Sequence, residues 1–477
     1  MTRTGGTTTA PAGDAGDLKE IVSISHEPDC AFTALALTLF ALSLGHAIDL
    51  NDGEYNHHAL AWLTISIFCC VVGITSPKWT AVESFCRRWL PAVLALGIAD
   101  QAFYLLQRMR SDPHITLAFC TITVLGLLQY LHLRGLRWPM LAIMVASFFI
   151  AGAIAFNLHS KDPRIDVFMF QMNGCWALIH KFNPYTFRYP SMYPPGTPFY
   201  GPGVVDSHGF LTVGFPYPPL SLFMALPGYL LGNDVRYSHV VAMGLSAALI
   251  AAARPGRIAA LAATLLLLMP RSIYVLDLSW TEPFLVLTFS LVMFCVCRWP
   301  QALPYALGLY FSTKQYTVLT LPLLPLLVGG PRHWKSLGII IFKAALVVIA
   351  INVPFIILNP HEFFRATLVF QFLQPFRWDA LSYLVFMRKH LPGIPTPLWI
   401  SLLPLVVIIP LSLRRLPSSP AGFAAAVTVV HLLFFAFNKQ AFCNYYYFVI
   451  ATACWSIAAA NISNPAPPIS SRRYTTA

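Results

Sequence analysis

The chain has 477 residues, of which 57% are hydrophobic and only 10% are charged, and its mean hydropathy is +0.64. Soluble domains carry about 25% charged residues, so this composition excludes a soluble enzyme with a membrane anchor and indicates a polytopic membrane protein. The formal net charge of +12 does not indicate nucleic-acid binding, because many basic residues lie in short connections between apolar runs and no basic recognition motif is found.

Residues 1–29 are rich in Thr, Gly and Ala and lack the apolar stretch of a signal peptide, so we expect a disordered cytoplasmic tail. Apolar runs then follow one another up to residue 460, and most are long enough to cross a bilayer. Their sum predicts about fourteen transmembrane helices. Five runs precede the first long break and nine follow it: 30–48, 58–75, 90–106, 114–131, 138–156, 238–253, 258–269, 283–297, 302–312, 316–328, 337–358, 397–413, 421–437 and 442–460.

The distribution of basic residues predicts the orientation of these helices. Most of them fall on one side if both termini are cytoplasmic, as the positive-inside rule requires; Arg108 and Arg110 are exceptions. Residues 219–232 are apolar, but a crossing there would invert everything that follows, so we expect a re-entrant or interfacial helix. The residues on the expected cytoplasmic side are Lys78, Arg87, Arg88, Arg134, Arg137, Arg254, Arg257, Arg298, Arg332, Lys335, Arg414, Arg415, Arg472 and Arg473.

The sequence therefore predicts an all-α, multi-pass protein of the plasma membrane with a cytoplasmic tail at 461–477. Two large outward segments, 158–237 and 359–395, are expected to assemble on the same face. The ten cysteines indicate neither a disulfide framework nor a zinc site, since several lie inside apolar runs and their spacing does not suit zinc.

The first outward segment contains Asp166 about ten residues after a span. Apolar neighbours, Ile165 and Val167, can raise the pKa of such a carboxyl group toward that of a working base. The alternative is that Asp166 only caps a helix over residues 167–180.

The order of the outward motifs is unusual. Asp166 is followed by the turn Asn183-Pro184-Tyr185, by Tyr217-Pro218-Pro219-Leu220, and by Lys314-Gln315 between two short helices. This order resembles polytopic GT-C type glycosyltransferases, in particular bacterial polyprenyl-phosphate-sugar-dependent mannosyl- and arabinofuranosyltransferases. The resemblance covers residues 138–460 and leaves 30–137 as four additional N-terminal transmembrane helices. It implies that Asp166 is the general base, although Ile165 and Val167 stand where many relatives have a polar or acidic residue.

Such an enzyme transfers a sugar, here expected to be mannose or a pentose, from a polyprenyl-phosphate donor to an outward-facing glycolipid or polysaccharide acceptor. The departing phosphate needs cations, hydrogen-bond donors or a divalent metal, Mg²⁺ or Mn²⁺; the sequence identifies no metal ligands. Four basic residues at outward ends of spans are not required by the positive-inside rule and are candidates for donor-phosphate binding: Arg271, Lys314, Arg377 and Lys439.

Lys314 leads these candidates because it separates two helices too short to span comfortably; the alternative is that it snorkels to the interface. Trp can stack on a sugar, and carboxylates, amides and phenols can bond to its hydroxyls. The expected sugar- or acceptor-binding residues are Asn183, Tyr185, Tyr217, Asp277, Trp280, Glu282, Gln315, Gln440 and Tyr445.

The sequence leaves two other functional classes open. A transporter or flippase of a glycolipid or polyprenyl-linked sugar would also have an aromatic cavity and charges inside the membrane, but no internal repeat is visible. A non-catalytic assembly protein could keep the fold without the chemistry, although Asp166 is present. Asp100, in the middle of the third span, has no obvious partner.

Overall fold

The computed structural model describes residues 30–76, 79–131, 133, 135–194, 196–254, 256–328 and 333–460. Within these ranges the chain is helical, and its only extended pairings are three isolated bridges, which confirms the all-α class. Both expected tails lie outside the described residues, as do Lys78, Arg134 and Arg332.

Helices of three kinds follow one another along the chain: those labelled α are α-helices, η3 and η7 are π-helical, and the other η elements are 3₁₀ helices. The first half contains α2 (Ala31–Asp49), η1 (Leu50–Gly53), α3 (His57–Thr75), α4 (Thr80–Met109), α5 (Pro113–Leu128), η2 (Gln129–Leu131), α6 (Arg137–Ile154), η3 (Ala155–His159), α7 (Asp166–Ile179), α8 (Pro219–Gly232), α9 (Arg236–Ala253) and α10 (Arg257–Leu267). The second half contains α11 (Ser272–Asp277), α12 (Glu282–Arg298), η4 (Pro300–Ala302), α13 (Leu303–Phe311), η5 (Gln315–Leu327), α14 (Trp334–Leu358), α15 (Pro360–Phe364), η7 (Arg365–Val369), α16 (Phe370–Leu373), α17 (Tyr383–His390), η8 (Leu398–Leu402), α18 (Leu403–Arg415), α19 (Pro420–Ala436) and α20 (Cys443–Ala459).

Each of the fourteen predicted apolar runs coincides with a helical segment, and residues 219–232 form the separate helix α8. Seven helical stretches in the described chain are long and apolar enough to cross a membrane: Ala31–Gly53, His57–Thr75, Thr80–Met109, Pro113–Leu131, Arg137–His159, Arg236–Ala253 and Trp334–Leu358. The remaining helices are shorter, so the structure supports a membrane protein without fixing the number of crossings.

Helix η5 is an unusual 3₁₀ helix of 13 residues that includes Pro322 and Pro325. A 3₁₀ helix rises about 2.0 Å per residue, so 13 residues reach about 26 Å, whereas an α-helix of that length reaches about 20 Å. The hydrocarbon core of a bilayer is about 30 Å thick. The tighter winding therefore lets a short apolar run cover most of that depth.

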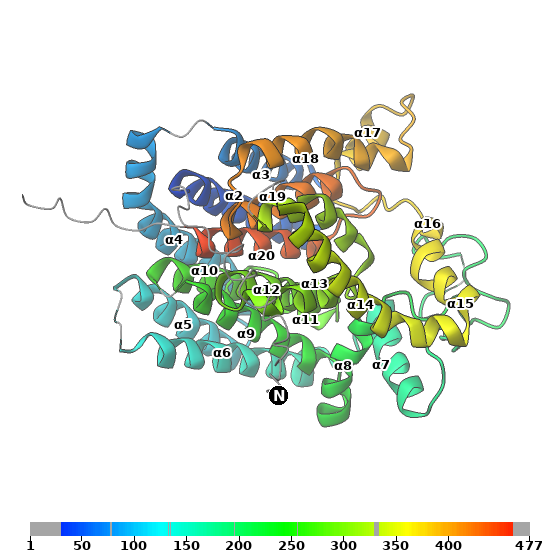
Figure 1. Ribbon diagram of the computed structural model, residues 1–477. Coiled ribbons are helices and arrows are strands. Elements are labelled where there is room, and N and C mark those ends of the chain that lie inside the picture. The colour runs from blue at the N-terminus through cyan, green and yellow to red at the C-terminus, as the bar shows by residue number, and fades with distance from the viewer. Residues whose placement is uncertain are drawn as a thin grey trace, which may run out of the picture.

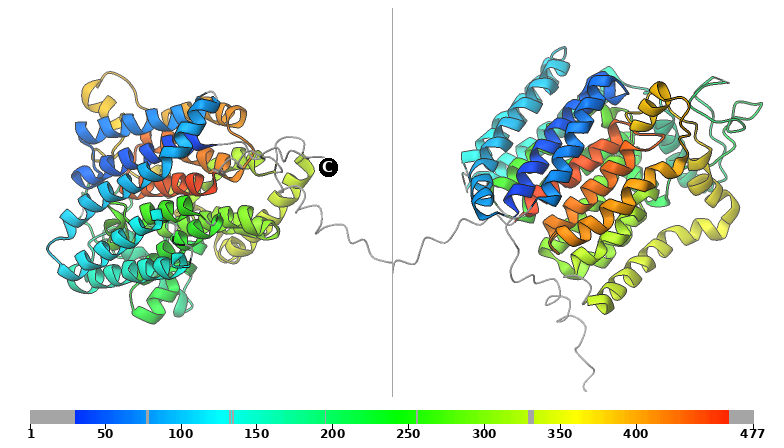
Figure 2. Two further views of the ribbon diagram at one scale, coloured as in Figure 1. Left: turned by 90° about the vertical axis from the view of Figure 1, so that its left-hand side faces the viewer. Right: turned by 90° about the horizontal axis from the view of Figure 1, so that it is seen from above.

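Most of the long helices run side by side, and α7, α15, α16 and α17 gather at one end of the bundle (Figure 1). Helix α2 packs against α3, α4 and α20, so the N-terminal helices belong to the same bundle as the rest. Almost every residue of α19 and α20 is buried. Helix α14 instead lies on the periphery with few buried residues, which suits a largely apolar helix in contact with lipid (Figure 2).

Basic residues at the two ends of the bundle form ion pairs and hydrogen bonds with neighbouring helices. Arg137 and Arg298 bond to the carbonyl oxygens of Ala251 and Ala252, so both lie near the end of α9. At the opposite end Arg108, an exception to the positive-inside rule, pairs with Asp49 at 2.6 Å.

Asp100 has partners that the sequence did not reveal. Its carboxylate lies 3.0 Å from Nε2 of His46 on α2 and accepts a hydrogen bond of 2.9 Å from Gln101. A carboxylate in an apolar helix is costly unless it is bonded to other polar groups. Helix α2 therefore supplies part of the environment that this residue requires.

Candidate active-site cavity

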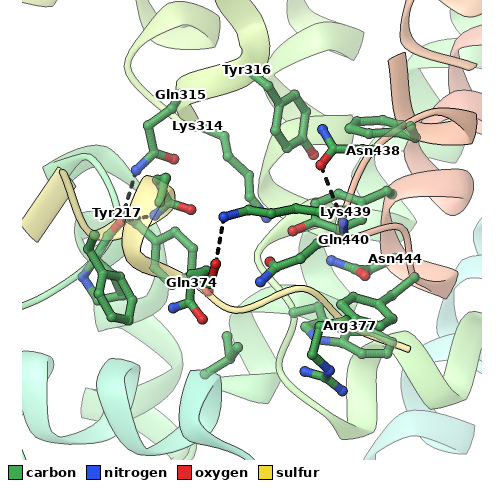
Figure 3. A pocket seen from close by; sticks show the side chains of 18 of the residues that line it. Tyr217, Lys314, Gln315, Tyr316, Gln374, Arg377, Asn438, Lys439, Gln440 and Asn444 are labelled. Atoms are coloured by element: carbon green, nitrogen blue, oxygen red, sulfur yellow. Dashed lines mark hydrogen bonds between the residues drawn. The ribbon is translucent and has the colours of Figure 1, made fainter. Parts of the chain in front are cut away.

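A cavity of about 1240 Å³ lies at the end of the bundle where the connecting segments gather. This volume exceeds the roughly 300–1,000 Å³ of a typical small-ligand site. Nine of the fourteen predicted site residues line it: Asp166, Tyr217, Trp280, Lys314, Gln315, Arg377, Lys439, Gln440 and Tyr445. Several of them are shown in Figure 3, where side chains from segments far apart in the sequence converge.

Asp166 is the first residue of α7, and its half-buried carboxylate faces the cavity. The hydroxyl of Tyr200 donates to Oδ2 at 3.1 Å, and the Asp166 amide donates to Oη of Tyr193 at 3.4 Å. Burial raises the pKa of Asp166 above its ordinary value of 3.8, while the hydrogen bond from Tyr200 and the charge of Arg377 act in the opposite direction. The carboxylate is thus a stronger base than an exposed aspartate.

Lys314 lies between α13 and η5 and forms a close ion pair with Glu282, which is fully buried at the start of α12. Tyr316 also donates to the same carboxylate oxygen, at 3.0 Å. The ammonium nitrogen lies 5.3 Å from the ring centres of Tyr217 and Tyr445 and 5.5 Å from that of Tyr316. The charge of Lys314 is therefore already balanced by a carboxylate and by aromatic rings.

Arg377 is also paired. Its guanidinium forms two hydrogen bonds with Asp379, of 2.9 and 2.5 Å, and lies 4.7 Å from the ring centres of both Phe199 and Phe442. The surrounding segment, residues 374–379, is not helical and contributes Gln374, Arg377 and Asp379 to the cavity wall. This segment therefore forms part of the cavity wall.

Lys439 differs from the other two cations. Its ammonium donates to the carbonyl oxygens of Phe372 at 3.2 Å and Gln374 at 2.6 Å, which leaves one of its three donors for another acceptor (Figure 3). No carboxylate pairs with it in the ranges that the structure describes. Burial lowers the pKa of Lys439, as expected for an ammonium that lacks a balancing charge. A bound anion would supply that charge.

Gln315 joins the two outward segments. Its amide nitrogen donates to the carbonyl oxygens of Pro216 and Thr367, at 2.8 Å each. A neighbouring amide, that of Gln371, also donates to Pro216, at 3.3 Å. These bonds fix the cavity wall, because they tie segments that are far apart in the chain to one side chain.

Asn183 and Tyr185 do not line the cavity but position a residue that does. The side-chain oxygen of Asn183 accepts a hydrogen bond of 3.0 Å from the Tyr185 amide, and the Tyr185 hydroxyl donates to the carbonyl oxygen of Tyr217 at 2.8 Å. The two motifs noticed in the sequence are thus joined. Their contacts hold Tyr217 against the cavity.

Arg271 and Asp277, two further predicted site residues, also lie off the cavity. Arg271 is buried and pairs with Asp52 at 2.5 Å, while its guanidinium donates to the carbonyl oxygen of Asp49 at 2.8 Å. Asp277 pairs with Arg236 at 3.2 Å. These contacts connect the outward ends of helices. Because both side chains are used in them, neither is expected to bind a ligand in the cavity.

Sequence reasoning missed several residues that line or support the cavity. Asp52 and Glu54, in the loop after α2, line it, as does Asn444 at the start of α20. In the sequence, Asp52 and Glu54 indicate only that this loop lies on the outward side. Nothing in the local sequence marks Tyr200, because it lies 34 residues from the carboxylate that it contacts.

One wall of the cavity is apolar and also faces outward from the protein. Its side chains come from η5, η7, α16 and η8, and they are between 48% and 73% exposed. Exposed apolar side chains around a polar cavity are typical of a surface that contacts lipid. The residues that both line the cavity and are exposed in this way are Val318, Leu368, Phe372, Trp399 and Leu402.

Within the described residues, no group of three or more His, Cys, Asp or Glu side chains is arranged to hold a metal ion. Assistance by Mg²⁺ or Mn²⁺ therefore has no ligand set in this part of the chain. No protein-family model, curated protein or solved structure matches the sequence. The cavity itself is accordingly the basis for assigning a function.

Proposed function

We propose that this protein is a GT-C-like membrane glycosyltransferase with about fourteen transmembrane helices and both termini in the cytoplasm. It would transfer mannose or a pentose from a polyprenyl-phosphate donor to a hydroxyl group of an outward-facing lipid or polysaccharide at the plasma membrane. One observation carries the proposal. A single large cavity combines the half-buried carboxylate of Asp166, the buried Lys439 without a carboxylate partner among the described residues, and an apolar wall that is exposed on the outside.

Each of these features has a role in the reaction. The apolar wall accommodates the first isoprene units of the donor, whose tail stays in the membrane. The remaining donor of Lys439 bonds to the phosphate and balances its charge. The aromatic side chains of Tyr217 and Tyr445, which also line the cavity, flank the sugar of the donor.

The chemical step is a single displacement at the anomeric carbon. The acceptor oxygen forms a bond to that carbon while the bond to the phosphate oxygen breaks, and the electron pair of the broken bond leaves with the polyprenyl phosphate. The acceptor hydroxyl gives its proton to Asp166, whose raised pKa suits this transfer. Lys439 stabilises the negative charge on the leaving phosphate.

The proposal is tested by Asp166→Asn in proteoliposomes supplied with a panel of polyprenyl-phosphate sugars and a membrane-lipid extract. We expect turnover to fall by about two to four orders of magnitude, because loss of a general base removes that much. Asp162→Asn is the matched control, since Asp162 is an exposed neighbour that does not line the cavity. Equal turnover in wild type and Asp166→Asn would exclude Asp166 as the base. Sugar-lipid flipping without transfer would favour a transporter.

A further inference from the structure

The loop between α2 and α3 is built into the cavity rim. Gly53 has a φ of +79° and lies so close to Cys443 that a Cβ atom would come within 2.9 Å of the cysteine Cβ. Glu54 forms an isolated bridge with Ala380, and the amide of Tyr55 donates to the carbonyl oxygen of Asp379 at 2.8 Å. The N-terminal helices therefore hold this loop against α20 and the second outward segment.

The loop brings two carboxylates to the cavity, and they differ in their partners. Asp52 is paired with Arg271 at 2.5 Å. Glu54 has no ion pair within the part of the chain that the structure describes. Partial burial raises the pKa of Glu54, and the nearby carboxylates of Asp379 and Asp52 raise it further. An anionic ligand beside Glu54 would add to this repulsion, whereas a hydroxyl donor would not.

A buried amide and two aromatic rings also line the cavity. Asn444 is only 3% exposed, and its side-chain oxygen has no hydrogen-bond partner among the described residues. The rings of Tyr274 and Trp280 pack edge to face with centres 5.5 Å apart, and both line the cavity. A buried acceptor without a partner is unfavourable, so Asn444 is suited to bind a ligand hydroxyl.

The position of Arg377 connects this region to the base. Arg377 lines the same cavity as Asp166 and Glu54, and it pairs with Asp379, whose carbonyl oxygen accepts a hydrogen bond from the amide next to Glu54, that of Tyr55. A ligand held by Glu54 and Asn444 would therefore occupy the same cavity as Asp166. The acceptors Glu54 and Asn444 match hydroxyl donors, and the aromatic faces match the C–H groups of a sugar ring.

We infer that Glu54, Asn444, Tyr274 and Trp280 form the acceptor subsite, and that the acceptor is an uncharged, polyhydroxylated glycolipid or glycan rather than an anionic phospholipid. This inference rests on the proposed glycosyl transfer. It also gives the N-terminal helices a function, because they place the loop that selects the acceptor.

Binding tests the inference without requiring turnover. The full-length protein in nanodiscs is titrated calorimetrically with octyl glycosides of mannose, glucose and maltose, and dioctanoyl-phosphatidylglycerol is added as a competitor. We expect at least one glycoside to bind, with about tenfold weaker affinity after Glu54→Ala or Asn444→Ala and no competition by the phospholipid. Glu362→Ala is the matched control, since Glu362 does not line the cavity.

Glu54 is exposed, so its variant should fold even if removal of the buried Asn444 does not allow folding. Unchanged affinity in Glu54→Ala would overturn the inference, as would competition by the phospholipid or the absence of glycoside binding. If the wild-type protein binds a glycoside but transfers no sugar, and the variants lose this binding, the subsite is supported and the proposed reaction is not. The two proposals can therefore fail separately.

Discussion

The ion pair between Lys314 and Glu282 allows the sequence-based role of Lys314 to be tested directly. Both side chains are buried, with exposed fractions of 6% and 0%. Removal of one partner from a buried ion pair costs about 3–5 kcal/mol, because the other charge is left without compensation. We therefore expect Lys314→Met and Glu282→Gln each to lower the thermal stability of the purified protein substantially.

The double variant Lys314→Met, Glu282→Gln removes both charges and leaves neutral side chains of similar size. We expect it to recover more than half of the stability lost by Lys314→Met alone, since replacement of a buried pair by neutral groups is often close to neutral. Unfolding midpoints are compared by intrinsic fluorescence in one detergent at one heating rate. Lys335→Met, at the exposed start of α14, is the control.

Donor affinity separates the two roles of Lys314. If its charge is balanced by Glu282, the double variant should bind the polyprenyl-phosphate donor within about threefold of wild type. If Lys314 binds the phosphate, both Lys314→Met and the double variant should lose affinity equally, and the stability of Lys314→Met should be close to that of wild type. The second pattern would refute the reasoning from the ion pair.

Three further predictions concern Lys439 and Asp166. Lys439→Gln removes the charge but keeps an N–H group that can bond to the carbonyl oxygens of Phe372 and Gln374. The KM for the polyprenyl-phosphate sugar should therefore rise about tenfold and lose much of its salt dependence. An unchanged KM would exclude phosphate binding by Lys439. Because Asp166 must be ionised to accept a proton, kcat/KM should fall as the pH drops through its raised pKa. Tyr200→Phe removes a hydrogen bond that lowers this pKa, so the acidic limb of the pH profile should move to higher pH, and an unmoved limb would contradict the assignment.

The sequence alone determined the helical elements to a large extent. The fourteen apolar runs and the separate helix over residues 219–232 match helical segments, with ends that mostly differ by a few residues. Apolar composition and Pro or Gly punctuation are local properties, so they can be read from a single segment. The largest difference is α4, which begins at Thr80 rather than residue 90, because Glu83, Arg87 and Arg88 lower the hydropathy of its first turns.

The sequence also identified many residues that meet at one cavity, since it located them at the outward ends of helices. Only the tertiary structure decided which of their charges are balanced. Lys314 pairs with Glu282, which is 32 residues away in the sequence, and Arg271 donates to the carbonyl oxygen of Asp49, which is 222 residues away. Lys439 instead bonds to backbone carbonyl oxygens. Ion pairing and desolvation depend on distances between segments that no local pattern encodes. For the same reason, the sequence did not show that the loop after α2 lines the cavity, because this depends on the packing of α2 against α20.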